Sequence, residues 1–398
     1  MALSDAIDSR RAGGLSSDDA SLAGGRLLFV DNLRWTMIVL VLSMHAADTY
    51  SPFGNWYYKE AHPVGFGTAL VFATYQSLLQ AFFMALLFFL AGYFAAGSYD
   101  RKGFALFLRD RIIRLGIATL LYMLVLGPLT QYFLSRTWGS GGFGYQWLTH
   151  LHDGEWQSET GPMWFCAALL VFSAIYACCR LLRPSRPPLE RLLHHPGNSD
   201  VLAFLAVLAA TTFLLRIVLP EDRSILNMHF GDFPQYLLMF AAGVAAFRGR
   251  WLTTLSERFC LRWAALTLIP AVPLFALLIL RGGAFQDDLS RYAGGFNLVS
   301  AGKCLWEALI CTGVSLLLLA IYRRWFDRQG SLARRLSDCA FGVYWIHPPL
   351  LISAALLLQG LAAPAIIKAA LLTFLAAALS YGVVMLVLRR TPLLRAIL

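Results

Sequence analysis

The chain has 398 residues, of which 58% are hydrophobic and only 14% are charged, and its formal net charge is +10. Because an average soluble domain is about 25% charged, this composition excludes a disordered or nucleic-acid-binding chain and disfavours an ordinary soluble enzyme. It predicts an all-α, polytopic membrane protein whose helices contact the lipid bilayer.

Residues 1–25 are polar and rich in Ser, Asp, Gly and Ala. They lack the apolar core of a cleavable signal peptide, so we expect a disordered cytosolic tail ahead of a transmembrane domain over residues 26–398. A membrane-crossing helix needs about 20 apolar residues. Ten apolar segments are predicted to cross: 33–50, 69–97, 112–134, 163–182, 200–219, 233–248, 263–281, 303–322, 339–358 and 365–388.

Most of the 33 Lys and Arg residues lie near the N-terminus and in every second connecting segment. Since positive residues favour cytosolic loops, this alternation predicts that both termini are cytosolic. The positive net charge therefore reflects orientation in the membrane, and no nucleic-acid partner is expected.

The loops predicted on the opposite side, 51–68 and 135–162, are rich in aromatic residues. Trp56 and Tyr57 lie in the first of these loops. Aromatic side chains at this depth commonly anchor a bundle in the membrane interface. The alternative is that they contact a substrate by stacking on its sugar rings.

The first predicted span carries ionisable residues at both ends of an apolar run, with Arg34 near its start and His45 and Asp48 near its end. Each such residue costs about 2.5–3.5 kcal/mol in a membrane helix, which makes it a candidate for function. Arg34 and His45 are eleven residues apart, which places them on nearly one helix face at a separation of roughly 16 Å. A long ligand with an anionic head at Arg34 would therefore reach His45.

His45 is the candidate general base, because imidazole exchanges protons near neutral pH. Asp48, one turn farther along, would orient the imidazole, and Asp31 would orient the Arg34 guanidinium. The alternative is that Arg34 only extends its charge to the membrane surface while His45 makes a structural hydrogen bond between helices.

A second basic site opens the third predicted span. Arg111 and Arg114 are neighbours on one helix face and would clamp phosphates beside Arg34, a geometry to which arginine is suited. The alternative is ordinary anchoring of the helix end by positive charge.

Three further residues are candidates for binding. His347 precedes Pro348 and Pro349, which must disrupt the hydrogen bonds of their span, and it would line a ligand site or make a structural hydrogen bond. Trp164 would either pack or contact substrate. Glu307 would pair with Lys303, one turn away, or contact a substrate. The cysteines have no C-x-x-C spacing, and no metal site is expected.

Four motifs together resemble the membrane acyltransferase-3 family, which includes periplasmic-glucan succinyltransferases. They are Arg34 and His45 as R-x10-H, Arg111 and Arg114 as R-x-x-R after the apolar run 88–94, Met163-Trp164-Phe165, and Tyr344-Trp345-Ile346-His347-Pro348-Pro349. The similarity extends from about residue 28 to residue 390.

The resemblance implies ten helices in a bacterial inner membrane, with His45 as the catalytic base and Arg34 as an essential residue. It associates Arg111 and Arg114 with binding of a cytosolic acyl-CoA, such as acetyl-CoA or succinyl-CoA, which is a co-substrate and not a permanently bound cofactor. The acceptor implied is a hydroxyl group of an extracytoplasmic glycan or glycolipid.

Two other classes remain open. A transporter or flippase also has charges inside the membrane and broken helices, although the two halves of this chain show no repeat. A non-catalytic membrane scaffold would leave the Arg34–His45 arrangement unexplained.

Overall fold

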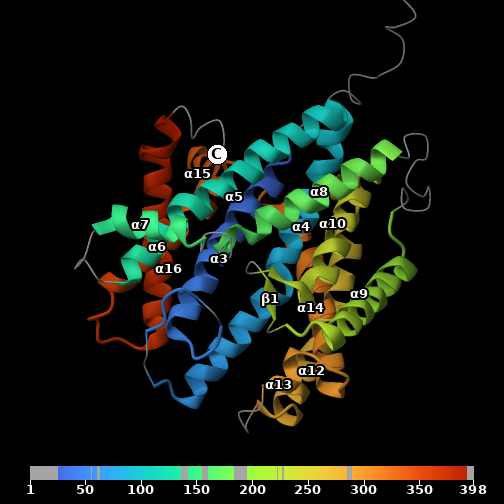
Figure 1. Ribbon diagram of the computed structural model, residues 1–398. Helices are drawn as coiled ribbons and strands as arrows, with labels where there is room; N and C mark the ends of the chain where they lie inside the picture. The colour runs from blue at the N-terminus through green and yellow to red at the C-terminus, as the bar shows by residue number, and fades with distance from the viewer. Residues whose placement is uncertain are drawn as a thin grey trace, which may run out of the picture.

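The structure is a computed structural model of a helical bundle (Figure 1). It describes residues 26–54, 56–60, 63–135, 142–154, 160–182, 195–221, 223–225, 228–284 and 289–391. The predicted N-terminal tail lies outside these ranges.

The elements follow one another along the chain in this order. They are α3 (Leu28–Tyr50), α4 (Phe66–Arg111), the π-helix η1 (Ile112–Ile117), α5 (Ala118–Leu121), the π-helix η2 (Tyr122–Leu126), α6 (Gly127–Ser135), α7 (Gly142–His152), η4 (Gly161–Met163), α8 (Trp164–Leu182), α9 (Asn198–Val218), β1 (Ser224–Ile225), β2 (Met228–His229), η6 (Phe230–Asp232), α10 (Phe233–Arg248), α11 (Trp251–Thr254), α12 (Glu257–Arg281), α13 (Ser290–Ala293), α14 (Leu298–Trp325), α15 (Ser331–Leu357), α16 (Ala365–Leu386) and η8 (Leu388–Arg390). The two short strands pair antiparallel.

Eight helical segments in the described part of the chain are long and apolar enough to cross a membrane. All ten predicted segments are helical, but two of them, 69–97 and 112–134, belong to one helical run over Phe66–Leu134. That run bends at Gly103, whose φ of 70° is a conformation that glycine adopts readily. The predicted segment 233–248 is α10, which has only 16 residues. Ten spans were therefore predicted where the described residues form eight long apolar segments, because one run contains two of the predicted spans and α10 is short. The all-α membrane bundle is confirmed.

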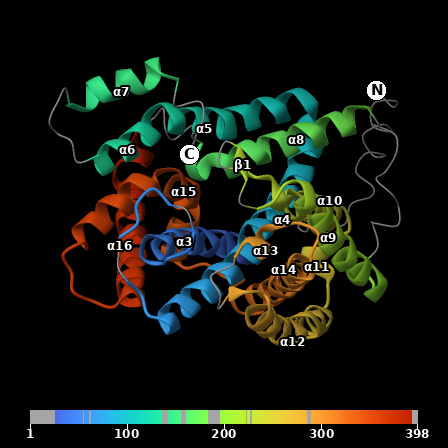
Figure 2. The same cartoon turned by 60° about the horizontal axis from the view of Figure 1, so that its bottom comes forward.

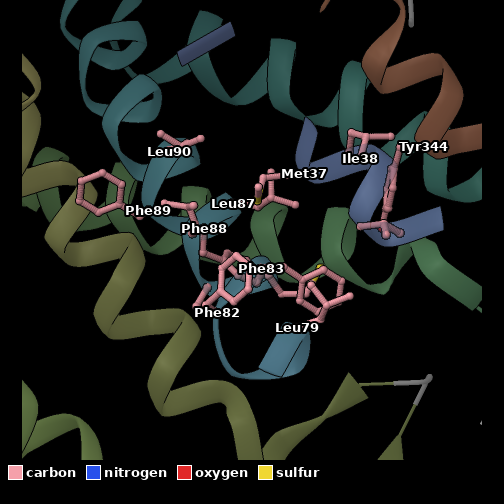
Figure 3. Packing of buried hydrophobic residues seen from close by; sticks show 14 of the residues in the cluster. Met37, Ile38, Leu79, Phe82, Phe83, Leu87, Phe88, Phe89, Leu90 and Tyr344 are labelled. Atoms are coloured by element: carbon pink, nitrogen blue, oxygen red, sulfur yellow. The ribbon is translucent and has the colours of Figure 1, made fainter. Parts of the chain in front are cut away.

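The first helix, α3, occupies the middle of the bundle and packs against α4, α14, α15 and α16. Its apolar side chains Met37 and Ile38 meet an aromatic-rich stretch of α4 and Tyr344 of α15 (Figure 3). In Figure 2, the segments α5, α6 and α8 cross one side of this bundle, and α8 contacts both α4 and α5. Residues at the end of α3 are thus surrounded by other helices.

The helices α4 and α10 approach so closely that two glycines are required between them. A Cβ atom on Gly243 would lie 1.9 Å from the carbonyl oxygen of Phe89, and a Cβ atom on Gly92 would lie 2.1 Å from that of Phe240. Membrane helices have little hydrophobic drive to associate, and small residues let their backbones meet. This contact fixes α4, which carries several residues of the site described below.

We expect Gly243→Val to destabilise the protein by about 1–3 kcal/mol or more, because the added side chain must push α10 away from α4. The measurement is thermal unfolding of the purified protein in detergent. Gly382→Val in α16 is the matched control, since a Cβ atom there meets nothing within 4 Å. Equal unfolding temperatures for the two variants would contradict the close approach.

Candidate functional site

His45 and Asp48 form a contact in the last turns of α3. The Nδ1 atom of His45 lies 3.4 Å from Oδ2 of Asp48, and their side chains are 20% and 5% exposed. Because an ionised carboxylate only accepts hydrogen bonds, Nδ1 carries the hydrogen and the neutral imidazole keeps an unprotonated Nε2. A partly accessible imidazole with this tautomer is equipped to remove a proton from a bound molecule.

Two rings lie nearly parallel to the ring of His45. Trp56, from the loop that follows α3, stacks on it with ring centroids 3.8 Å apart, and His347 of α15 stacks at 5.4 Å. Tyr57 meets the edge of Trp56, and its hydroxyl lies 3.3 Å from that of Tyr122. The structure therefore brings together, around His45, three residues that were separate candidates in the sequence: Trp56, Tyr57 and His347.

The orientation of His347 follows from the prolines after it. Pro348 has no N–H group, so it cannot make the helical hydrogen bond to the carbonyl of Tyr344 four residues earlier. The Nδ1 atom of His347 instead donates to that carbonyl, at 2.7 Å. His347 is fully buried, and its Nε2 has no hydrogen-bond partner among the described residues. This Nε2 is a bare acceptor close to the ring of His45.

The predicted arginines converge from α3, α4 and η1. Arg34 is 46% exposed, lies 3.7 Å from Asp31, and has its guanidinium 5.9 Å from the centre of the Phe94 ring. Arg111 is close enough to Arg34 and Arg114 for their positive charges to repel its own. Such a concentration of guanidinium groups suits an anion with several charged oxygens.

The other two predicted binding residues lie in different surroundings. Trp164 packs against the rings of Phe88, Phe165 and Tyr236, which favours its packing alternative. Glu307 pairs with Lys303 at 3.7 Å, as the ion-pair alternative requires, but its closer partner is Arg216 at 2.8 Å.

Sequence reasoning missed polar residues inside the spans, among them Gln76 and Arg216. Gln76 of α4 donates a hydrogen bond to Asp48 at 2.6 Å, and Arg216 of α9 joins a buried group of acidic residues. The signal for both was present, because a buried amide or charge inside an apolar segment is costly and is retained only with partners.

Comparisons with known proteins give one match. No curated protein and no solved structure shows significant similarity to the chain. A family model described as an acyltransferase domain matches residues 27–389, which include every motif and side chain described above. The chain therefore belongs to the membrane acyltransferase-3 family.

Proposed function

We propose that this multi-pass membrane acyltransferase moves an acyl group from cytosolic acyl-CoA to a hydroxyl group of an extracytoplasmic carbohydrate or glycolipid. The observation that carries the proposal is the partly exposed His45, whose Nδ1 faces Asp48, on the same helix as Arg34 and eleven residues beyond it. The proposal places both termini in the cytosol and the protein in a bacterial inner membrane.

The donor site is formed by Arg34, Arg111 and Arg114. Like charges held together are unfavourable without an anion, and the phosphates of coenzyme A supply one with several oxygens for bidentate contacts. From that end, an extended thioester arm must cover roughly 16 Å along α3 to reach His45. Ile38 and Val41 lie between the two residues on that face, and both are buried among neighbouring side chains.

The chemical step needs one base and no covalent intermediate on the protein. His45 Nε2 takes the proton of the acceptor hydroxyl as its oxygen attacks the thioester carbonyl. The carbon–sulfur bond breaks, the new ester leaves on the outer side, and the thiolate recovers the proton from the imidazolium. Asp48 stabilises the positive imidazolium while it exists. An acyl-histidine intermediate is the less favoured alternative.

The acceptor enters beside the loop that carries Trp56 and Tyr57. Glu60 of that loop forms a buried ion pair with Lys368 of α16, and its N–H donates to the carbonyl of Thr49 at 2.9 Å. These contacts hold the loop in place, with Trp56 over His45 and Tyr57 at the edge of Trp56, and aromatic rings of this kind suit the face of a sugar.

The test is acyl-CoA consumption by the purified protein in liposomes. We expect acetyl-CoA or succinyl-CoA to release its thiol only when an envelope glycan or glycolipid fraction is present, and mass spectrometry to find the acyl group on the acceptor. Movement of the acceptor across the membrane without thiol release would instead support a transporter.

Two charge-removing variants sharpen this test. Arg34→Gln should raise the KM for acyl-CoA about 10- to 100-fold, since a charge-assisted hydrogen bond is worth about 1.5–3 kcal/mol. Arg258→Gln removes an exposed positive charge from α12 and should leave that KM unchanged. Equal effects of the two variants would argue against a donor site at Arg34.

A further inference from the structure

The carboxylate of Asp48 is buried, with only 4% of the residue exposed, and its two oxygens have different partners. Oδ2 faces Nδ1 of His45 at 3.4 Å, and Oδ1 accepts a hydrogen bond from Nε2 of Gln76 at 2.6 Å. Gln76 comes from a different helix, α4, and is only 6% exposed. The hydrogen bond from Gln76 is therefore the shorter of the two contacts that hold this carboxylate in place.

The Gln76 amide has partners at both ends. Because a carboxylate only accepts hydrogen bonds, the NH2 group faces Asp48. Oε1 then faces the hydroxyl of Ser51 at 2.9 Å, and this hydroxyl also lies 2.8 Å from the carbonyl of Phe53. Gly54 closes the remaining side, because a Cβ atom there would lie 2.1 Å from Oδ1 of Asp48. Gly54 has a φ of +78°, which other residues rarely adopt. Loop, amide and carboxylate thus form one closely fitted unit.

A neutral amide suits this position better than a cation. A lysine or arginine would compensate the charge of Asp48 directly and draw the carboxylate away from His45. An amide satisfies one oxygen by a hydrogen bond and leaves the full negative charge available to the imidazolium. Without the amide, the buried anion is costlier, because one of its oxygens loses its hydrogen-bond donor.

We propose that Gln76 is a positioning residue that acts through Asp48 to set the tautomer and orientation of His45. This inference rests on the proposed function, in which His45 is the base. Gln76 touches neither substrate, so its contribution is to the rate of the chemical step and not to donor binding.

The experiment compares Gln76→Leu with the wild type in the liposome assay. We expect kcat to fall about 10- to 100-fold, the usual effect of removing a hydrogen bond to a charged group, while the KM for acyl-CoA stays within about twofold. Tyr75→Phe is the matched control on the adjacent residue. It removes a 2.6 Å hydrogen bond to Ser43 between the same two helices, and Ser43 keeps its bond to the Leu40 carbonyl. Its kcat should match the wild type.

A double-mutant cycle separates positioning from general packing. In an Asp48→Asn background, Gln76→Leu should cause no further loss of kcat, because the residue through which it acts is already altered. Additive losses, or a wild-type kcat for Gln76→Leu, would overturn the inference. If Gln76→Leu does not fold, Gln76→Met offers similar length without a donor and is read in the same way.

The outcome also distinguishes this inference from the proposed function. If His45→Gln is inactive while Gln76→Leu behaves as wild type, only the role of Gln76 fails. If His45→Gln remains active, the proposed base itself is wrong.

Discussion

Replacing His45 with glutamine is expected to lower acyl transfer by about a thousandfold while leaving the protein folded. A general base contributes about 10²–10⁴ to rate, and a glutamine side chain cannot take up a proton at working pH. The loss of packing is small, because the two side chains are of similar size and His45 is partly exposed. The measurement is acceptor-dependent release of coenzyme A thiol from the purified variant in liposomes.

His195→Gln is the matched control for this prediction. His195 lies in the loop before α9, with Nδ1 3.5 Å from the hydroxyl of Thr254. It should retain wild-type activity. An active His45→Gln protein, expressed and folded like the control, would show that His45 is not the general base.

His347 is a second imidazole close to His45, and its polar partners differ from those of His45. Its Nδ1 faces a neutral carbonyl where that of His45 faces a carboxylate. A positive charge on His347 would be fully buried, and no carboxylate of the described residues pairs with it, which makes that charge costly. His347 is therefore suited to accept a hydrogen bond through its bare Nε2, and His45 to hold the proton.

Much of the fold was predictable because a membrane helix can be recognised from a long apolar segment of the sequence alone. Long apolar segments can only be helices when a bilayer surrounds them, and all ten predicted segments are helical. The continuity of Phe66–Leu134 was less predictable. The sequence separates two spans between residues 97 and 112, and the structure bends there at Gly103 within one helical run.

The site was predictable where its residues share one helix. The spacing of Arg34, His45 and Asp48 translates directly into position on α3, because helical geometry is regular. The contact of Gln76 with Asp48 joins residues 28 apart on different helices, and the stacking of Trp56 on His45 requires the loop to return. Such contacts depend on tertiary packing, which cannot be predicted from the spacing of residues along the sequence.

The same limit applies to the buried ionic group around Arg216. Arg216 of α9 contacts Asp232 of η6, Glu307 of α14 and Glu221 of the connecting loop. Lys303 contacts Glu221 and Glu307. Lys303 and Glu307 were associated from their spacing of one turn, but Arg216, their central partner, comes from another helix.

The second large effect is expected from Arg216→Met, which should destabilise the folded protein by about 3–5 kcal/mol. Arg216 is only 1% exposed, and its removal takes the guanidinium away from Asp232 and leaves Glu221 and Glu307 with Lys303. Since proteins are stable by only about 5–15 kcal/mol, a sharp loss of folded protein should follow. Thermal unfolding and yield in detergent measure it, with Arg281→Met, an exposed position at the end of α12, as control.

We expect Arg216→Met to act through the charge of the buried ionic group and not through its packing. Burial alone would raise the pKa of Glu221, but the positive charges of Lys303 and Arg216 outweigh burial and lower this pKa to about 2. A lowered pKa stabilises the folded state above the unfolded value, and this contribution is lost as pH falls from about 4.5 towards 2. If charge is the cause, adding Glu307→Gln to Arg216→Met should recover part of the lost stability, because one unpaired anion is removed. No recovery in the double variant would mean that the Arg216 side chain stabilises the bundle by filling space, since loss of its volume is common to both variants.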